Sequence, residues 1–192
     1  MMESRQERLE LHPIFDRFAL YNDHYDGELD SLGDALGRDC MIAAFASEAP
    51  AFMRLFTGDG SKNEDWFSYG AKVFAPASGK IVYLYINKET NIPGTQNPSR
   101  ASALLIETPD GTSILLGHID NPVVALGDKV EEGQLLAYVG NNGYARCPHI
   151  HIGAYRKGKP LAIDFDAQKV AKVRRQVGER YWITGVQEPQ KE

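Results

Sequence analysis

The residues of this sequence best suited to chemistry are its histidines, and two of them lie close together. His149 and His151 belong to the segment Cys147-Pro148-His149-Ile150-His151-Ile152-Gly153. If this segment is a strand, its side chains alternate between two faces, so the imidazoles share one face and the isoleucines anchor the other. Neutral imidazole is both a zinc ligand and a proton carrier near neutral pH, and two adjacent rings can divide these roles. The segment predicts a reaction centre; the alternative is a pair of half-exposed histidines on an edge strand.

A third histidine also stands where a sheet can present a functional group. His118 follows the apolar run Ser113–Leu116 and Gly117, at the end of an expected strand. Functional side chains are often carried by the loops into which rigid strands lead. His118 is therefore a candidate for the same reaction centre.

The elements that must position these histidines form a mainly β region. Short strands are separated by glycine turns, and Pro109-Asp110-Gly111 has the composition of a hairpin turn. This spacing predicts a compact antiparallel sheet sandwich or barrel in an α+β chain. The expected strands are 72–76, 79–86, 102–108, 112–118, 123–126, 134–139 and 148–155.

Three regions are expected along the chain. Residues 1–69 are predicted to be an irregular and partly helical N-terminal extension that contributes possible metal ligands, and residues 70–165 to be the β core. Residues 166–192 are expected to form a helix and a tail, because apolar positions between Asp166 and Val177 fit a helix laid on the sheet.

The composition narrows the classes of function. The net charge of −5 argues against a general nucleic-acid-binding protein, which would normally have a basic face. No apolar run approaches the length of a membrane span, and the charged N-terminus does not lead into a signal-peptide core. We therefore expect a cytoplasmic protein, or an extracellular or periplasmic one if an export segment has been removed. The two cysteines, Cys40 and Cys147, are expected to be reduced.

Four motifs in order resemble the lysostaphin (LytM) type of zinc metallopeptidase, a family of peptidoglycan endopeptidases with the duplicated hybrid motif fold. The resemblance covers roughly residues 70–155. The matching motifs are Phe74-Ala75-Pro76-Ala77-Ser78-Gly79, Leu116-Gly117-His118-Ile119, the hairpin Gly127–Gln134, and the loop Gly140–Gly143 followed by Pro148-His149-Ile150-His151.

The resemblance implies a zinc site and roles for the histidines. His151 would be a zinc ligand, while His118 and His149 would activate water and stabilise the oxyanion. The family takes its other ligands from an upstream His-x-x-x-Asp motif. Here Gly37-Arg38-Asp39 keeps the second part of this motif, but Ala35 stands where the histidine is expected.

Other histidines can supply the missing ligand. We expect the zinc ligands to be His24, Asp39 and His151, with His24 reaching the metal from a preceding loop. An alternative is His12 with Asp16, which have the literal spacing, and a third possibility is an incomplete site that binds no zinc.

The function implied is that of a divergent zinc metalloendopeptidase, a hydrolase that cuts peptide cross-links of peptidoglycan. One alternative is a non-catalytic relative that uses the groove as a binding module. The other is a sugar-phosphotransferase-like domain with His118 as phosphate acceptor, a reading that leaves His149 and His151 unexplained. The expected partner is a peptide or peptidoglycan-type substrate; the sequence does not indicate an oligomeric state.

Overall fold

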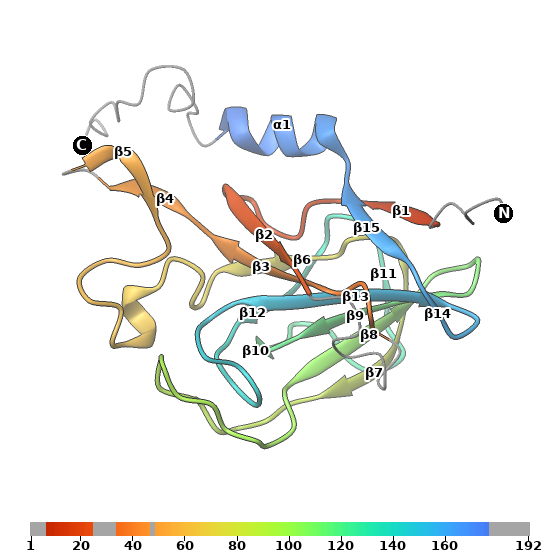
Figure 1. Cartoon of the computed structure of the whole chain (residues 1–192). Helices are drawn as coiled ribbons and strands as arrows, with labels where there is room; N and C mark the ends of the chain where they lie inside the picture. The colour runs from red at the N-terminus through yellow and green to blue at the C-terminus, as the bar shows by residue number, and fades with distance from the viewer. Residues whose placement is uncertain (1–6, 25–33, 47–48, 177–192) are drawn as a thin grey trace, which may run out of the picture.

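One large sheet organises the molecule and carries most of its strands (Figure 1). The structure is a computed structural model, and it describes residues 7–24, 34–46 and 49–176. Hydrogen bonds join the strands of the large sheet in the order β11-β7-β8-β9-β13-β3-β2, and β14 pairs with β13. These strands are β2 (Ala19–Asp23), β3 (Arg38–Ile42), β7 (Gly79–Tyr85), β8 (Ala103–Glu107), β9 (Thr112–Gly117), β11 (Lys129–Val130), β13 (Ile150–Arg156) and β14 (Lys159–Pro160).

Alternation of side chains gives this sheet one face in the core and one face open to a groove. Ile106, Ile114, Leu116, Ile150 and Ile152 are fully buried on the core face. All the pairings in this sheet are antiparallel. Because residues paired across antiparallel strands share a face, the register fixes which side chains reach the groove.

A smaller sheet covers the core face. It has the order β10-β12-β6, and its buried side chains join the same hydrophobic cluster as those of the large sheet. Its most buried residues, each 1% exposed or less, are Val73, Ile119, Leu136, Ala137 and Val139. The strands are β6 (Lys72–Phe74), β10 (Ile119–Asp120) and β12 (Leu135–Val139).

The remaining elements lie around these two sheets. A parallel pair joins β1 (Arg8–Leu11) to β15 (Ala162–Phe165), and a separate hairpin joins β4 (Ala44–Ala46) to β5 (Ala49–Arg54). A 3-10 turn, η2, spans Asn63–Asp65, and the α-helix α1 (Ala167–Gln176) runs above β2 in Figure 1. No helix in the described part of the chain is long and apolar enough to cross a membrane.

The mainly β class, the antiparallel sheets and the C-terminal helix are confirmed. The expected helical pieces in residues 1–69 are wrong for the described part of that region, which forms β1 to β5 and the short turn η2. The strand β3 pairs with β2 on one side and with β13 on the other, so this part of the sheet depends on a partner more than 100 residues away. The expected strand at 123–126 is also absent: these residues form bends and turns, with Val123 and Leu126 exposed.

Candidate metal centre and active site

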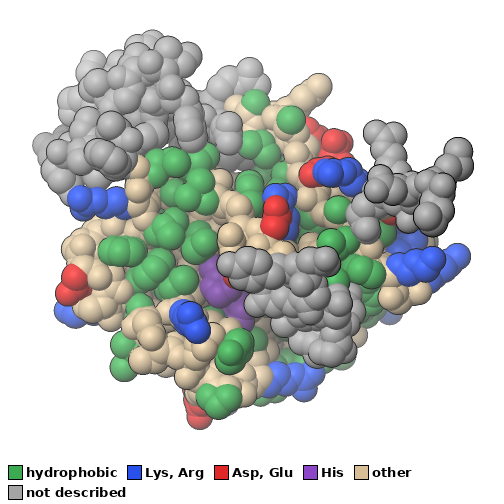
Figure 2. All heavy atoms as spheres, in the orientation of Figure 1, with side chains coloured by type: hydrophobic (Ala, Val, Ile, Leu, Met, Phe, Trp, Pro, Cys, Tyr) green, Lys and Arg blue, Asp and Glu red, His purple; other side chains and the backbone are tan. Residues whose placement is uncertain are grey.

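The open face of the large sheet forms the floor of a groove with a volume of about 610 Å³. Figure 2 shows histidine side chains near the middle of this face of the molecule, with hydrophobic side chains beside them. All five predicted site residues line the groove: His24, Asp39, His118, His149 and His151. The other residues that line the groove are Asp34, Met41, Gln96, Ala101, Ala103, Leu105, Leu115, Gly117, Tyr144, Ala145, Arg146, Cys147 and Tyr155.

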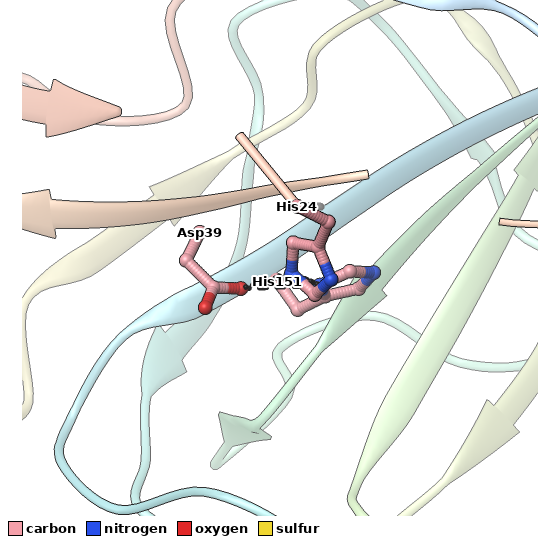
Figure 3. Close-up of side chains that lie close together, drawn as sticks. All are labelled: His24, Asp39 and His151. Carbon is pink, nitrogen blue, oxygen red and sulfur yellow. Dashed lines mark hydrogen bonds and ion pairs between the residues drawn. The ribbon is translucent and has the colours of Figure 1, made fainter. Parts of the chain in front are cut away.

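Three neighbouring strands bring one histidine–aspartate–histidine cluster together. His151 on β13 is paired with Asp39 on β3, so both side chains point to the groove. On the other side of β3, Asn22 of β2 is paired with Asp39. His24 lies two residues after Asn22, so its side chain points to the same face, and its backbone N–H donates to the carbonyl of Gly37. The register of the sheet therefore places all three side chains on the same face (Figure 3).

The ligand atoms of this cluster converge on one point. His24 Nε2 and His151 Nδ1 each lie 3.1 Å from Asp39 Oδ1, and the two nitrogens lie 3.2 Å apart. Zinc bound tetrahedrally with bonds of about 2.0–2.1 Å would separate its ligand atoms by about 3.3 Å. Two imidazole nitrogens and one carboxylate oxygen at these separations fit a zinc ion, and within the described residues this is the group that could hold a metal.

Gly37 is needed in this arrangement because the backbone passes close to the histidine. A Cβ atom at position 37 would lie 2.6 Å from Cε1 of His151, closer than real Cβ contacts allow. The glycine of the Gly-x-Asp motif thus leaves room for the ring of His151 beside Asp39. This is a packing reason for the motif, in addition to the carboxylate it supplies.

The other two groove histidines form a second pair next to the cluster. The ring centroids of His118 and His149 lie 4.5 Å apart. His118 Nδ1 donates to the backbone carbonyl of Asn142 at 2.9 Å, and His149 Nδ1 donates to that of Cys147 at 2.8 Å. Because carbonyl oxygens only accept, both Nδ1 atoms carry hydrogen, which leaves each Nε2 to act on the groove side.

His118 is held in an unusual backbone conformation. Its φ is +62°, a left-handed value that costs a non-glycine residue of the order of 1 kcal/mol or more. Its N–H donates to the carbonyl of Ser102, and its own carbonyl accepts from the N–H of Gly140. Strain maintained by several hydrogen bonds is typical of functional positions.

The loop that follows β12 supplies the residue that fixes His118. The side chain of Asn142 is buried; its Oδ1 accepts from the N–H of Ser102, and its Nδ2 donates to the carbonyl of Ile119. These two bonds hold Asn142 rigidly, so that its carbonyl stays in place for the ring of His118. The Gly140–Gly143 loop thus orients a groove histidine on the neighbouring strand end.

The surroundings of the groove histidines shift their pKa values in different directions. Burial and the neighbouring His149 lower the pKa of His118 to about 3. Burial also disfavours charge on His149, but hydrogen bonding to Asp39 and to Cys147 raises its pKa to about 10. Burial also disfavours charge on His151, but the adjacent carboxylates of Asp34 and Asp39 favour the charged ring and raise its pKa to about 9. Burial acts to raise the pKa of Asp39, but the surrounding histidines hold it well below its usual range.

The structure brings together His24, Asp39, His118, His149 and His151 and leaves the alternative ligand pair elsewhere. His12 Nδ1 donates to the carbonyl of Pro13, and its ring lies against Gly133, in the turn between β11 and β12. Asp16 is exposed and does not line the groove.

Two residues that the sequence reasoning did not single out belong to the site. Asp34 accepts a hydrogen bond from Nε2 of His151, 117 residues further along the chain, and Asn142 orients His118. The Gly-Asn-Asn-Gly loop was visible as a motif, whereas nothing in the sequence around Asp34 indicated its partner.

Residues 64–163, half of the chain, match Peptidase family M23. The chain belongs to this family. No curated protein matches the sequence.

The solved structures that are similar to this chain show only a distant likeness. The antimicrobial peptidase lysostaphin from Staphylococcus simulans is 19% identical, with a TM-score of 0.43 over 76% of this chain and 48% of that one. A zinc-containing peptidase from Vibrio cholerae is 17% identical, with a TM-score of 0.39 over 65% of this chain and 48% of that one. The complex of SpoIIIAH and SpoIIQ contains a chain 18% identical, with a TM-score of 0.47 over 80% and 96%. This chain spans 39%, 62% and 48% of three of the similar structures.

Proposed function

We propose that this M23 chain is a zinc-dependent endopeptidase that hydrolyses peptide bonds in cell-wall cross-links. The observation that carries the proposal is the convergence of His24, Asp39 and His151 at ligand distances, in the same groove as His118 and His149. Three protein ligands with one open side are the usual composition of a catalytic zinc site.

The chain's own residues would divide the work around this metal. His24 Nε2, Asp39 Oδ1 and His151 Nδ1 would hold the zinc ion. Zinc in such a site supplies a Lewis acid that polarises a peptide carbonyl and makes water more acidic.

His118 and His149 would handle the proton. Neutral His118 presents an unprotonated Nε2 to the groove, so it can accept a hydrogen bond from the attacking water and orient it. His149 is held through Nδ1 by the carbonyl of Cys147, so its Nε2 would serve to pass a proton to the developing oxyanion or to the leaving amine.

The shape of the groove fits a peptide with small side chains. Ala101, Ala103, Ala145 and Gly117 are among its lining residues, so an extended main chain can approach the sheet closely. Glycine or D-alanine at the cleaved bond would suit this space. Tyr144 and Arg146 are exposed at the rim, where they can contact flanking parts of a substrate.

A binding module is the second candidate. It is favoured by Ala35, which stands where the family motif has its upstream histidine, so that the site depends on His24 from another strand. A groove that has lost its metal could still bind a cell-wall peptide without cutting it.

Metal content and peptidase activity distinguish the two functions. We expect about one zinc per chain by elemental analysis of the purified protein, and cleavage of pentaglycine or D-alanine-containing cell-wall peptides that stops when zinc is chelated and returns when it is restored. His151→Ala should lose both zinc and activity, whereas His118→Ala should keep zinc and lose activity. Wild-type protein that stays free of zinc after metal is supplied, but binds these peptides, would establish the binding module instead.

A further inference from the structure

The side chain of Asp34 lies on the far side of the His151 ring from the ligand cluster. Its Oδ2 accepts a hydrogen bond from His151 Nε2, while Nδ1 of the same ring faces His24 and Asp39. The Asp34 side chain is 7% exposed, so water does not compete strongly for this bond. Asp34 is thus connected to the cluster through one ring and supplies no atom to it.

Two glycines make the space in which this pair is held. A Cβ atom at Gly153 on β13 would overlap the carboxylate of Asp34, and one at Gly37 would collide with the ring of His151. The backbone N–H of Gly37 also donates to the carbonyl of Asp34 at 3.1 Å, which closes a turn between Asp34 and β3. The two glycines therefore leave room for the carboxylate and the ring, and the bond from Gly37 fixes the backbone that carries Asp34.

The bond to Asp34 decides which nitrogen of His151 carries hydrogen. A carboxylate accepts and does not donate when ionised, so Nε2 must keep its hydrogen to make this bond. The neutral ring then has its lone pair on Nδ1, the nitrogen that faces the cluster. A carboxylate behind a ligand histidine also increases the basicity of the ring and fixes its orientation.

We propose that Asp34 is a positioning residue that sets the tautomer and orientation of His151 for zinc binding through Nδ1. The inference rests on the proposed zinc site. It adds a residue that strengthens metal binding without contacting metal or substrate, and it explains why β13 has glycine two residues after His151.

The first test is the protonation of His151 in the zinc-loaded wild-type protein, read from the ¹⁵N NMR signals of its ring. We expect a hydrogen-bonded proton on Nε2 and the metal on Nδ1. A ring with zinc on Nε2, or with no proton there, would overturn the proposal even if zinc is bound.

The second test compares zinc affinities, measured by competition with a chromophoric chelator at one pH. Asp34→Ala should weaken binding by about 10–100-fold, the usual effect of removing such a partner. Asp34→Asn should lose less, because its amide oxygen can still accept from Nε2. The matched control Asp16→Ala removes an exposed carboxylate outside the groove and should bind zinc like the wild type.

The outcomes separate this inference from the proposed function. If the wild type binds zinc and Asp34→Ala binds it equally well, Asp34 has no positioning role and the zinc site stands. If the wild type binds no zinc, the proposed function itself fails. If circular dichroism shows that Asp34→Ala is unfolded, the Asp34→Asn variant and the wild-type NMR spectrum decide instead. A wild-type zinc affinity in Asp34→Asn, together with an unprotonated Nε2 of His151 in the wild type, would overturn the proposal.

Discussion

His151 on β13 lies directly opposite Asp39 on β3, with its Nδ1 3.1 Å from the Asp39 carboxylate. This pairing joins residues 112 positions apart, and it is fixed by the core-facing neighbours on the same strands. Cys40 and Ile150, which are paired one step away, are both fully buried. A shift of one residue would turn both the core and the site residues to the wrong face, so burial of the core also sets the geometry of the cluster.

The choice of upstream histidine can be tested directly. His24→Ala should reduce the zinc content of the purified protein strongly, because it removes one of three converging ligand atoms. His12→Ala should leave zinc content unchanged, since its ring lies against Gly133 outside the groove. Elemental analysis after dialysis measures both. Loss of zinc in His12→Ala but not in His24→Ala would contradict the ligand set proposed here.

The orientation of His118 by Asn142 gives a second prediction. In Asn142→Ala the backbone N–H of Ser102 and the carbonyl of Ile119 lose their partners, and each unsatisfied buried group costs about 1–3 kcal/mol. We expect lower thermal stability and a fall in kcat, with zinc content preserved because no ligand is touched. His118→Ala is the comparison: it should reduce kcat with less loss of stability. If Asn142→Ala keeps its wild-type kcat, the loop does not position His118.

Substitutions at Gly153 and Asp34 should have coupled effects on zinc affinity. Gly153→Ala should weaken zinc binding about as much as Asp34→Ala, since the added Cβ displaces the carboxylate from His151. In the double variant Asp34→Ala/Gly153→Ala the added methyl group has room, so its further cost should be small. Zinc affinities of the four proteins form a double-mutant cycle, and simple additivity of the two losses would argue against a shared mechanism.

The sequence could group the downstream histidines as candidates because its signals there are local. Alternation in the 147–153 segment places His149 and His151 on one face without knowledge of the rest of the fold, and the strands from β6 to β13 are dense enough in β-branched residues and glycine turns to be recognised. The upstream half depends on long-range pairing. β2 and β3 have five residues each, too few for a reliable periodicity, and become strands by pairing with each other and with β13.

Asp34 could not be found for the same reason. Asp34 lies five residues before Asp39 in a segment without regular structure, and its hydrogen-bond partner is the distant His151. Hydrogen-bond partners at such separations follow from the fold and leave no pattern in the neighbouring sequence. In the structure the missing side chain of Gly153 makes room for Asp34, which the sequence around either residue does not indicate.

The two cysteines offer a test of how the sheet separates its faces. Cys40 is fully buried on the core face, and Cys147 is partly exposed and lines the groove. Burial, together with the nearby charge of Asp39, raises the pKa of the Cys40 thiol well above its usual range, so that little reactive thiolate forms in the folded protein. At pH 8 we expect Ellman's reagent to label one thiol in the native protein and two after unfolding in guanidinium chloride. Cys147→Ser should remove the native reaction and Cys40→Ser should not; rapid labelling of Cys40 in the folded Cys147→Ser variant would mean that β3 does not bury this residue as the structure has it.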